Sequence, residues 1–194
     1  MTTDDELLAA ALDFYAWLDG EDPRLTGLSL TLVRPAGPQA LVRLNPTRTF
    51  EGELSLSEAG DRVLDGLDSS RLAVQVDELN GWTTLIEPFG WAGATPEVLA
   101  RLSASGGRAV NVYWNVNALM HVGWADDGRI IASFDPLLDD RPDDREPEEA
   151  DLPFGDPRLA LRAAFVLVER LTHVRIRRDW LLDRARRTSE IPVP

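Results

Sequence analysis

The sequence lacks cysteine and lysine, and it contains no apolar run long enough to cross a bilayer. Without cysteine, disulfides, thiolate zinc sites, iron-sulfur clusters and cysteine nucleophiles are excluded. Because all 20 basic residues are arginine, a Schiff-base lysine and the lysine of a phosphate-binding P-loop are excluded as well. The first residues are acidic and amphipathic, unlike the basic-then-apolar order of a secretory signal, so we expect a cytoplasmic protein.

Histidine is almost as scarce and shows no catalytic pattern. His121 and His173 are far apart and have no metal-ligand spacing, and we expect a structural or surface role for His121. Segment 90–95, before a predicted helix, is a candidate for holding an anion on free amides, and the alternative is an ordinary capping loop. The acids in 139–144 lack the glycine and final glutamate of a calcium loop. We therefore expect no catalytic residue, no metal and no cofactor.

Negative charge is what the chain has in excess. Its 33 acidic and 20 basic residues give a formal net charge of -13, which repels nucleic acid and anionic lipid. At 194 residues and 44% hydrophobic composition, the chain is long enough for one domain with its own core. We expect a single domain over 1–194 and a protein partner, basic in character, with no nucleic acid and no membrane as partner.

The stretch from Arg108 to Pro136 predicts three adjacent antiparallel strands, with a hairpin corner at Asp127-Gly128. Apolar residues alternate along its first strand and should face a core: Val110, Val112, Trp114 and Val116. Polar residues occupy the opposite face: Asn111, Tyr113, Asn115 and Asn117. A shift of one residue would bury the amides and expose the valines, so we expect a firmly held register.

Turn and cap signals divide the rest of the chain. In chain order, the expected elements are a capped helix from Thr3 to Gly20, strands at 28–33 and 40–44, a short helix at 58–67, strands at 71–79 and 82–87 joined by Asn80-Gly81, a helix between Thr95 and Gly106, and a buried helix after Asp156 that reaches Leu171. Segment 45–57 has no clear period. This order predicts an α+β fold, an antiparallel meander sheet packed on one face by helices.

Two charged segments follow the sheet. Residues 138–152 are acidic, rich in proline and almost without apolar residues, so we expect a flexible loop. Residues 174–194 predict a basic C-terminal helix and tail. Attraction between the tail and the acidic loop is one interpretation, and a binding site for another protein is the other. An exposed sheet edge would also allow a homodimer.

The candidate binding residues are Glu87, Trp91, Asn111, Tyr113, Asn115 and Asn117. They offer amides, a phenol and one carboxylate but no nucleophile, which favours recognition over catalysis. The alternative is an ordinary solvent-facing side of an antiparallel sheet, although asparagine is a poor strand former. Two interpretations are also open for the tryptophans. Either Trp82, Trp91 and Trp114 line a pocket, or they pack in the core, which is the more common role of large aromatic residues in a small domain.

The chain contains a series of short motifs, which are GWTTLIEP at 81–88, GWAG at 90–93, YWNVNAL at 113–119, DG at 127–128, SFDP at 133–136, FGDP at 154–157 and ERLT at 169–172. In this order they resemble an actinobacterial family that is catalogued only as a domain of unknown function. The resemblance covers roughly Gly81 to Leu182 and implies a single α+β domain and an actinobacterial cytoplasm. Similar sequences have glycine where this chain has His173, so we expect His173 at a left-handed helix terminus.

Two functional hypotheses follow. The first is a non-enzymatic protein-binding module, such as an immunity or accessory protein that binds a basic partner, because acidity and few catalytic groups suit electrostatic steering. The second is a small-molecule or nucleotide sensor, or a weak hydrolase, that uses the polar sheet face.

Overall fold

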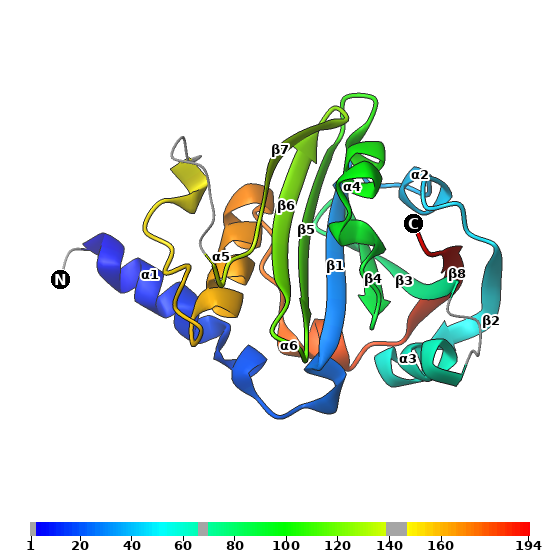
Figure 1. The fold of residues 1–194 in the computed structure, drawn as a ribbon, viewed down its shortest axis with the longest axis horizontal. Helices are drawn as coiled ribbons and strands as arrows, with labels where there is room; N and C mark the ends of the chain where they lie inside the picture. Colours follow the sequence, from blue (N-terminus) through cyan, green and yellow to red (C-terminus); the bar gives the residue numbers. More distant parts are fainter. Residues whose placement is uncertain (1–2, 66–69, 139–146) are drawn as a thin grey trace.

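The computed structural model describes residues 3–65, 70–138 and 147–194, and its centre is an antiparallel sheet (Figure 1). In the described residues the sheet has eight strands in the order β2-β8-β3-β4-β1-β5-β6-β7. The strands are β1 (Gly27–Arg34), β2 (Arg48–Leu54), β3 (Arg71–Leu79), β4 (Trp82–Pro88), β5 (Arg108–Asn115), β6 (Met120–Asp126), β7 (Arg129–Phe134) and β8 (Arg186–Pro192). With the helices packed against this sheet, the predicted single α+β domain is confirmed.

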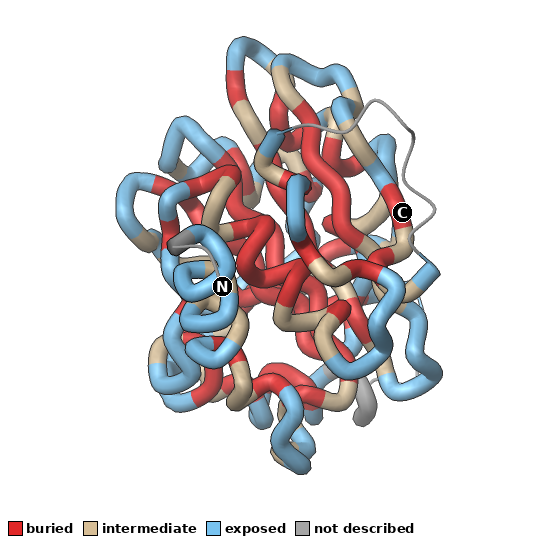
Figure 2. The backbone as a smooth tube through the Cα atoms, turned by 90° about the vertical axis from the view of Figure 1, so that its left-hand side faces the viewer, coloured by how far each residue is buried: buried red, intermediate tan, exposed pale blue. Residues whose placement is uncertain are grey.

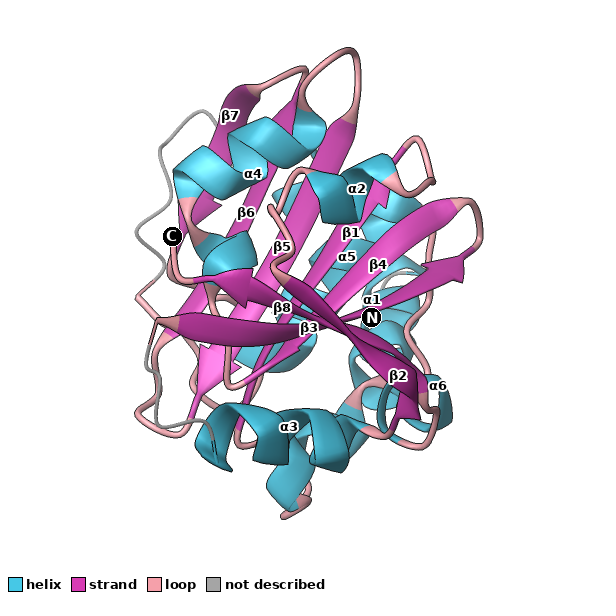
Figure 3. Ribbon diagram, turned by 90° about the vertical axis from the view of Figure 1, so that its right-hand side faces the viewer, coloured by secondary structure: helices cyan, strands magenta, loops and turns pink. Residues whose placement is uncertain are grey.

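Helices cover both faces of the sheet (Figure 3), whereas the sequence predicted helices on one face only. The α-helices are α1 (Thr3–Phe14), α2 (Gln39–Val42), α3 (Leu56–Asp65), α4 (Pro96–Ser103), α5 (Ala160–Thr172) and α6 (Arg178–Leu182). Short 3-10 helices are η1 (Ala16–Asp19), η2 (Pro23–Leu25), η3 (Ala92–Ala94) and η4 (Pro147–Glu149). Figure 3 shows α4 and α2 in front of the sheet and α5 and α1 behind it. None of the helices in the described ranges is long and apolar enough to cross a membrane.

Strands β5, β6 and β7 follow one another as the sequence predicts. Val110, Val112 and Trp114 are buried in the core cluster beneath α5, because their alternation turns them to one face of the pleated sheet. Val116 is an exception. It follows the end of β5 and is 72% exposed.

The first half of the chain departs from prediction in three places. The helix expected from Thr3 to Gly20 is α1, which ends at Phe14, followed by the separate 3-10 helix η1. The expected strand 40–44 is instead helix α2 with its C-terminal turn, and Ala40 and Leu44 are the buried positions, one helical turn apart. Segment 45–57 contains the strand β2, which lies at the edge of the sheet. Its side chains are mostly exposed and its register shifts between Thr49 and Glu53, so no alternation marks it.

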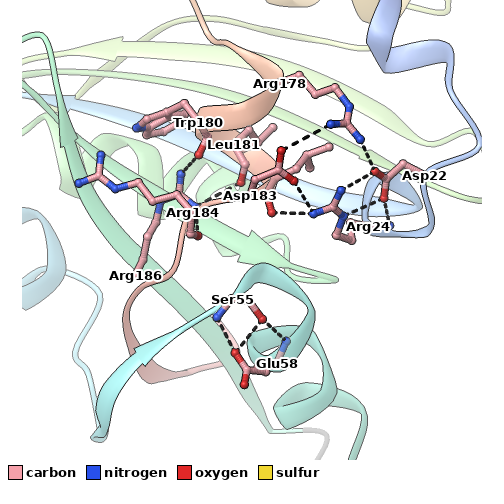
Figure 4. Close-up of polar contacts among 11 residues, drawn as sticks. Asp22, Arg24, Ser55, Glu58, Arg178, Trp180, Leu181, Asp183, Arg184 and Arg186 are labelled. Atoms are coloured by element: carbon pink, nitrogen blue, oxygen red, sulfur yellow. Dashed lines mark hydrogen bonds and ion pairs between the residues drawn. The ribbon is translucent and has the colours of Figure 1, made fainter.

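Helix α3 begins slightly earlier than predicted because of a reciprocal cap (Figure 4). Ser55 N donates to Glu58 Oε2 over 2.8 Å, and Glu58 N donates to Ser55 Oγ over 3.2 Å. This is the capping-box arrangement, in which two free amides are satisfied at once. Residues 66 and 67 of the predicted helix lie outside the described residues.

Two strands pair with neighbours that are far from them in the sequence. Strand β1 lies between β4 and β5, and β8 lies between β2 and β3. The prediction of a basic C-terminal helix and tail at 174–194 is therefore incomplete. The segment contains α6, but it ends as a strand inside the sheet (Figure 1).

The predicted flexible loop at 138–152 is described only in part, since 139–146 lie outside the described residues. Its last residues pack on the domain. Leu152 is buried, and the Arg170 guanidinium of α5 donates to the carbonyl oxygens of Glu148 and Ala150 over 2.9 and 2.7 Å. This end of the segment is thus fixed to α5.

Candidate functional site

The polar face of β5 leads into a buried cluster. Asn111 is fully buried, and its Nδ2 donates to Ser29 Oγ and Thr31 Oγ1 of the neighbouring β1, each over 2.9 Å. The expectation that this amide faces a recognition surface is wrong, because η3 and α4 cover this side of the sheet. When both faces of a strand are covered, polar side chains on it must find partners inside the protein.

Glu87 lies in the same cluster and is also buried. Its Oε2 accepts from Ala92 N over 2.7 Å and its Oε1 accepts from Gly93 N over 2.9 Å. Burial raises the pKa of Glu87 to about 7, although hydrogen bonds from the Gly93 and Ala92 amides and from the Ser29 hydroxyl act to lower it. The amides at 90–95 that were candidates for holding an anion are therefore already occupied by the carboxyl group of Glu87, a residue of the chain itself.

Close packing leaves little space beside this carboxylate. A Cβ atom at Gly90 would lie 2.7 Å from Glu87 Cβ, and one at Gly93 would overlap Thr31 Oγ1. Glycine is required at both positions because the backbone of 90–93 lies so close to the Glu87 side chain and, at Gly93, to Thr31 and Asn111. The geometry supports a structural role for Glu87 and Asn111 better than a sensor or hydrolase site.

Three of the remaining predicted residues, Tyr113, Asn115 and Asn117, form a second, separate group at the end of β5. Asn115 Nδ2 donates to the Tyr113 hydroxyl over 2.8 Å, and Asn115 Oδ1 accepts from Asn117 N over 2.9 Å. Asn115 thus organises the β5–β6 turn, which explains an asparagine at a strand end. Asn117 is exposed in that turn.

The three tryptophans divide between the core and the surface. Trp82 and Trp114 are buried, and their indole N–H groups donate to the carbonyl oxygens of Thr172 and Leu25. Trp91 is 40% exposed beside η3. Core packing is therefore the correct interpretation for two of them.

The two histidines occupy separate positions. His121 Nε2 lies 2.8 Å from Ser133 Oγ on the adjacent β7. His173 has φ 58° and ends α5, with its backbone N–H donating to Glu169 O over 2.7 Å. The predicted left-handed helix terminus at His173 is confirmed.

The basic C-terminal segment is largely neutralised within the fold (Figure 4). Arg178 pairs with Asp22 over 3.0 Å, and Arg24 of η2 donates to the Leu182 carbonyl oxygen and to Asp183 Oδ1 over 2.8 and 2.9 Å. A hydrogen bond from Arg24 holds the pKa of Asp22 down at about 2. These contacts fasten α6 to the segment before β1.

Arg186 is the most deeply buried of the C-terminal arginines. Its guanidinium lies 3.3 Å from Asp77 Oδ2 and 4.6 Å from the Trp180 ring centroid. It also donates to the carbonyl oxygens of Trp180, Leu181 and Arg184. A buried cation with this many acceptors is a structural element. Among the described residues, the carboxylates that pair with this segment are Asp22, Asp77, Glu169, Asp179 and Asp183. The predicted attraction between the tail and the acidic loop falls largely on 139–146, which lie outside the described residues.

An open groove lies between α1 and α5. It has a volume of about 620 Å³ and is lined by Asp4, Asp5, Leu7, Leu8, Ala11, Asp151, Val166, Glu169, Arg170, His173 and Arg175. Helix α1 packs on the core through partly buried Leu8, Ala11 and Leu12 and leaves Leu7 65% exposed. In Figure 2 much of the N-terminal helix is drawn as exposed, in front of a buried interior.

The positive charges of this groove have acceptors inside the protein. Arg175 lies 2.6 Å from Glu169 Oε1, and Arg170 donates to backbone carbonyls. Glu169 also accepts from the Tyr15 hydroxyl over 2.8 Å. Within residues 3–65, 70–138 and 147–194, no arginine pairs with Asp4 or Asp151. The groove therefore combines an exposed leucine with two carboxylates, Asp4 and Asp151, that have no arginine partner among the described residues.

Sequence reasoning did not single out this groove. The wide apolar stripe from Leu7 to Leu18, which the structure divides between α1 and η1, predicts only that this segment packs against the rest of the domain. The sequence signal that could have indicated the groove is the width of this stripe. It is wider than the surface that one helix packs against its neighbours, so some of its apolar residues stay exposed. The neighbouring wall comes from α5, more than 150 residues later, as the Tyr15–Glu169 hydrogen bond shows.

A family model described as a family of unknown function (DUF6461) matches residues 8–153. The match starts in α1, so it includes the N-terminal region that the sequence motifs cover least, and it stops before α5. No curated protein sequence and no solved structure gives a significant match to the chain.

Proposed function

We propose, for a chain that belongs to the DUF6461 family of unknown function, that it is a non-enzymatic protein-binding module. Its groove between α1 and α5 receives a segment of a partner protein, and that segment carries basic residues beside an apolar one. The observation that supports this proposal is the exposure of Leu7 in a groove lined by Asp4, Asp5 and Asp151. An immunity or accessory protein that neutralises a basic partner would use such a surface.

Each part of the groove contributes a different property to binding. Full burial of one leucine side chain contributes about 1.5–3 kcal/mol, so Leu7 is a suitable anchor. The carboxylates at the rim attract a cationic partner over several ångströms and select against acidic partners. With a net charge of -13, the whole molecule adds to this attraction.

The test compares a groove variant with a matched control. The groove variant combines Leu7→Ser with Asp4→Asn and Asp151→Asn, and the control combines Val42→Ser with Glu97→Gln and Asp156→Asn, which are also exposed residues of the same kinds. Each protein is immobilised, a host extract is passed over it at low salt, and retained proteins are identified by mass spectrometry.

The expected result is one basic protein that the wild type and the control retain, that the groove variant loses, and that elutes as salt is raised. The proposal fails if no protein is retained at low salt, or if the groove variant and the control retain the same proteins equally.

A further inference from the structure

A second hollow lies at the edge of the sheet that β2 forms. It shares no lining residue with the groove between α1 and α5. It has a volume of about 580 Å³, and its lining includes Arg48, Thr49, Phe50 and Glu51 of the edge strand β2, with Arg62 of α3 and Glu190 of β8. Two of these residues are cations in a chain whose net charge is -13. This hollow is independent of the groove proposed for protein binding.

Both cations are held on one aromatic ring. The guanidinium carbons of Arg48 and Arg62 lie 5.0 and 5.7 Å from the centroid of the Phe50 ring, within the range of a cation–π interaction. A guanidinium held against a ring keeps N–H donors at its edges available for other acceptors. Phe50 therefore brings two sets of donors to one hollow.

The other polar residues that line the hollow either have a partner within the protein or carry a negative charge. Glu190 Oε2 lies 3.4 Å from Arg71, and the Thr49 hydroxyl is 2.9 Å from Ser189 Oγ. In the described residues, no carboxylate forms an ion pair with Arg48 or Arg62, whereas Arg24, Arg108, Arg162 and Arg175 all have one. Glu51 and Glu190 also line the hollow, but among the described residues neither forms an ion pair with Arg48 or Arg62. An anion placed between the two guanidinium groups is therefore stabilised.

We propose that Arg48, Phe50 and Arg62 form a binding site for the phosphate group of a small, hydroxylated phosphate monoester. A phosphate offers several acceptor oxygens and two negative charges to the two guanidinium groups, and it relieves the repulsion between them. The Glu51 carboxylate, also in the lining, can accept a hydrogen bond from a ligand hydroxyl but repels a bare anion. This combination favours a phosphate carried by a polyol over inorganic phosphate.

The test titrates the full chain with ribose 5-phosphate, inorganic phosphate and ribose, and follows the arginine Nε–H signals by NMR. Ribose 5-phosphate should bind saturably, with a Kd of about 1 mM or tighter, and ribose should not bind. Arg48→Gln and Arg62→Gln should each weaken binding about tenfold, because each removes charge-assisted hydrogen bonds. Phe50→Leu should weaken it with both cations still present.

Arg129→Gln is the matched control, since Arg129 is an exposed arginine at the opposite edge of the sheet, and it should leave binding unchanged. Far-UV circular dichroism checks that each variant is folded. The proposal is overturned if ribose 5-phosphate does not saturate, if inorganic phosphate alone binds, or if folded Arg48→Gln and Arg62→Gln variants bind as the wild type does.

Discussion

Two regions of the molecule carry carboxylates beside apolar surface, and they differ in how the carboxylates are satisfied. Under η3, Glu87 is sealed and accepts from two backbone amides. In the groove between α1 and α5, Asp4 and Asp151 face solvent without an arginine partner among the described residues. The first region was predicted from sequence as a recognition surface and the second was not. The comparison teaches that a polar side chain marks a binding surface only when the fold has not already used its hydrogen bonds.

The pH dependence of stability tests the sealed region and should be the largest effect. The folded pKa of Glu87, about 7, is raised above its ordinary value of 4.5. A raised carboxyl pKa means that the folded state binds the proton more tightly, so this contribution to stability is present below pH 4.5 and is lost as pH rises through 7. The loss should amount to about 3 kcal/mol.

The matching variant is Glu87→Gln, which cannot ionise. Its free energy of unfolding is measured by urea denaturation between pH 4.5 and pH 8, beside that of the wild type. The difference between the two proteins should change across this window, since other titrating groups are shared. A parallel pair of curves would show that Glu87 is not sealed and would remove the contrast with the groove.

Gly93→Ala tests the same region by packing. An added Cβ would overlap Thr31 Oγ1 and lie 2.9 Å from Asn111 Nδ2, so η3 must move away from the strands. Overpacking of this kind costs about 1–3 kcal/mol. The control is Gly20→Ala, whose nearest neighbour would be Trp17 O at 3.3 Å and whose effect should stay within about 1 kcal/mol. Equal loss of stability in the two variants, measured by denaturation, would contradict the close approach of η3.

His173→Gly tests whether His173, which lines the groove, lowers the stability of the protein through its backbone conformation. His173 has φ 58°, a conformation that costs a non-glycine residue roughly 1–2 kcal/mol, part of which the greater freedom of glycine in the unfolded chain offsets. The variant should therefore be more stable by about 0.5–1 kcal/mol. Because His173 lines the groove, retention of the basic partner that we propose should fall in the same variant. A rise in stability with unchanged retention would leave His173 as a helix terminus alone.

Local patterns predicted much of the fold correctly. The alternation of Val110, Val112 and Trp114 identified β5 and its buried face, and Asn80-Gly81 identified the turn between β3 and β4, where both residues have positive φ. These features could be predicted because each is determined by residues that are close together in the sequence. Strand β8 was missed because its charged residues conceal it. Arg186 is buried there only because Asp77, Trp180 and three carbonyls surround it.

The candidate site was predicted less well, for a physical reason. An antiparallel sheet commonly has one solvated face, so a row of asparagines and a tyrosine suggested a surface. Whether Asn111 meets solvent depends on η3, and η3 is placed by the carboxylate of Glu87 and the missing side chain of Gly93. The sequence contains all three residues, but their meeting is a tertiary contact. The groove has the same origin, since its walls come from opposite ends of the chain.

Leu7→Ala tests the open region, and its effect on stability should be the smallest. Leu7 is 65% exposed, so truncation should change the free energy of unfolding by no more than about 0.5 kcal/mol, whereas Leu8→Ala, at a partly buried position of the same helix, should cost more. Retention of the basic partner should show the reverse order, because an exposed leucine gains burial only in the complex. Denaturation curves and binding are measured on both variants. Truncating a residue that stabilises the fold lowers stability, whereas truncating a residue that contacts the partner lowers binding. Were Leu8→Ala to weaken binding more than Leu7→Ala at equal stability, the partner would contact the floor of the groove and not its rim.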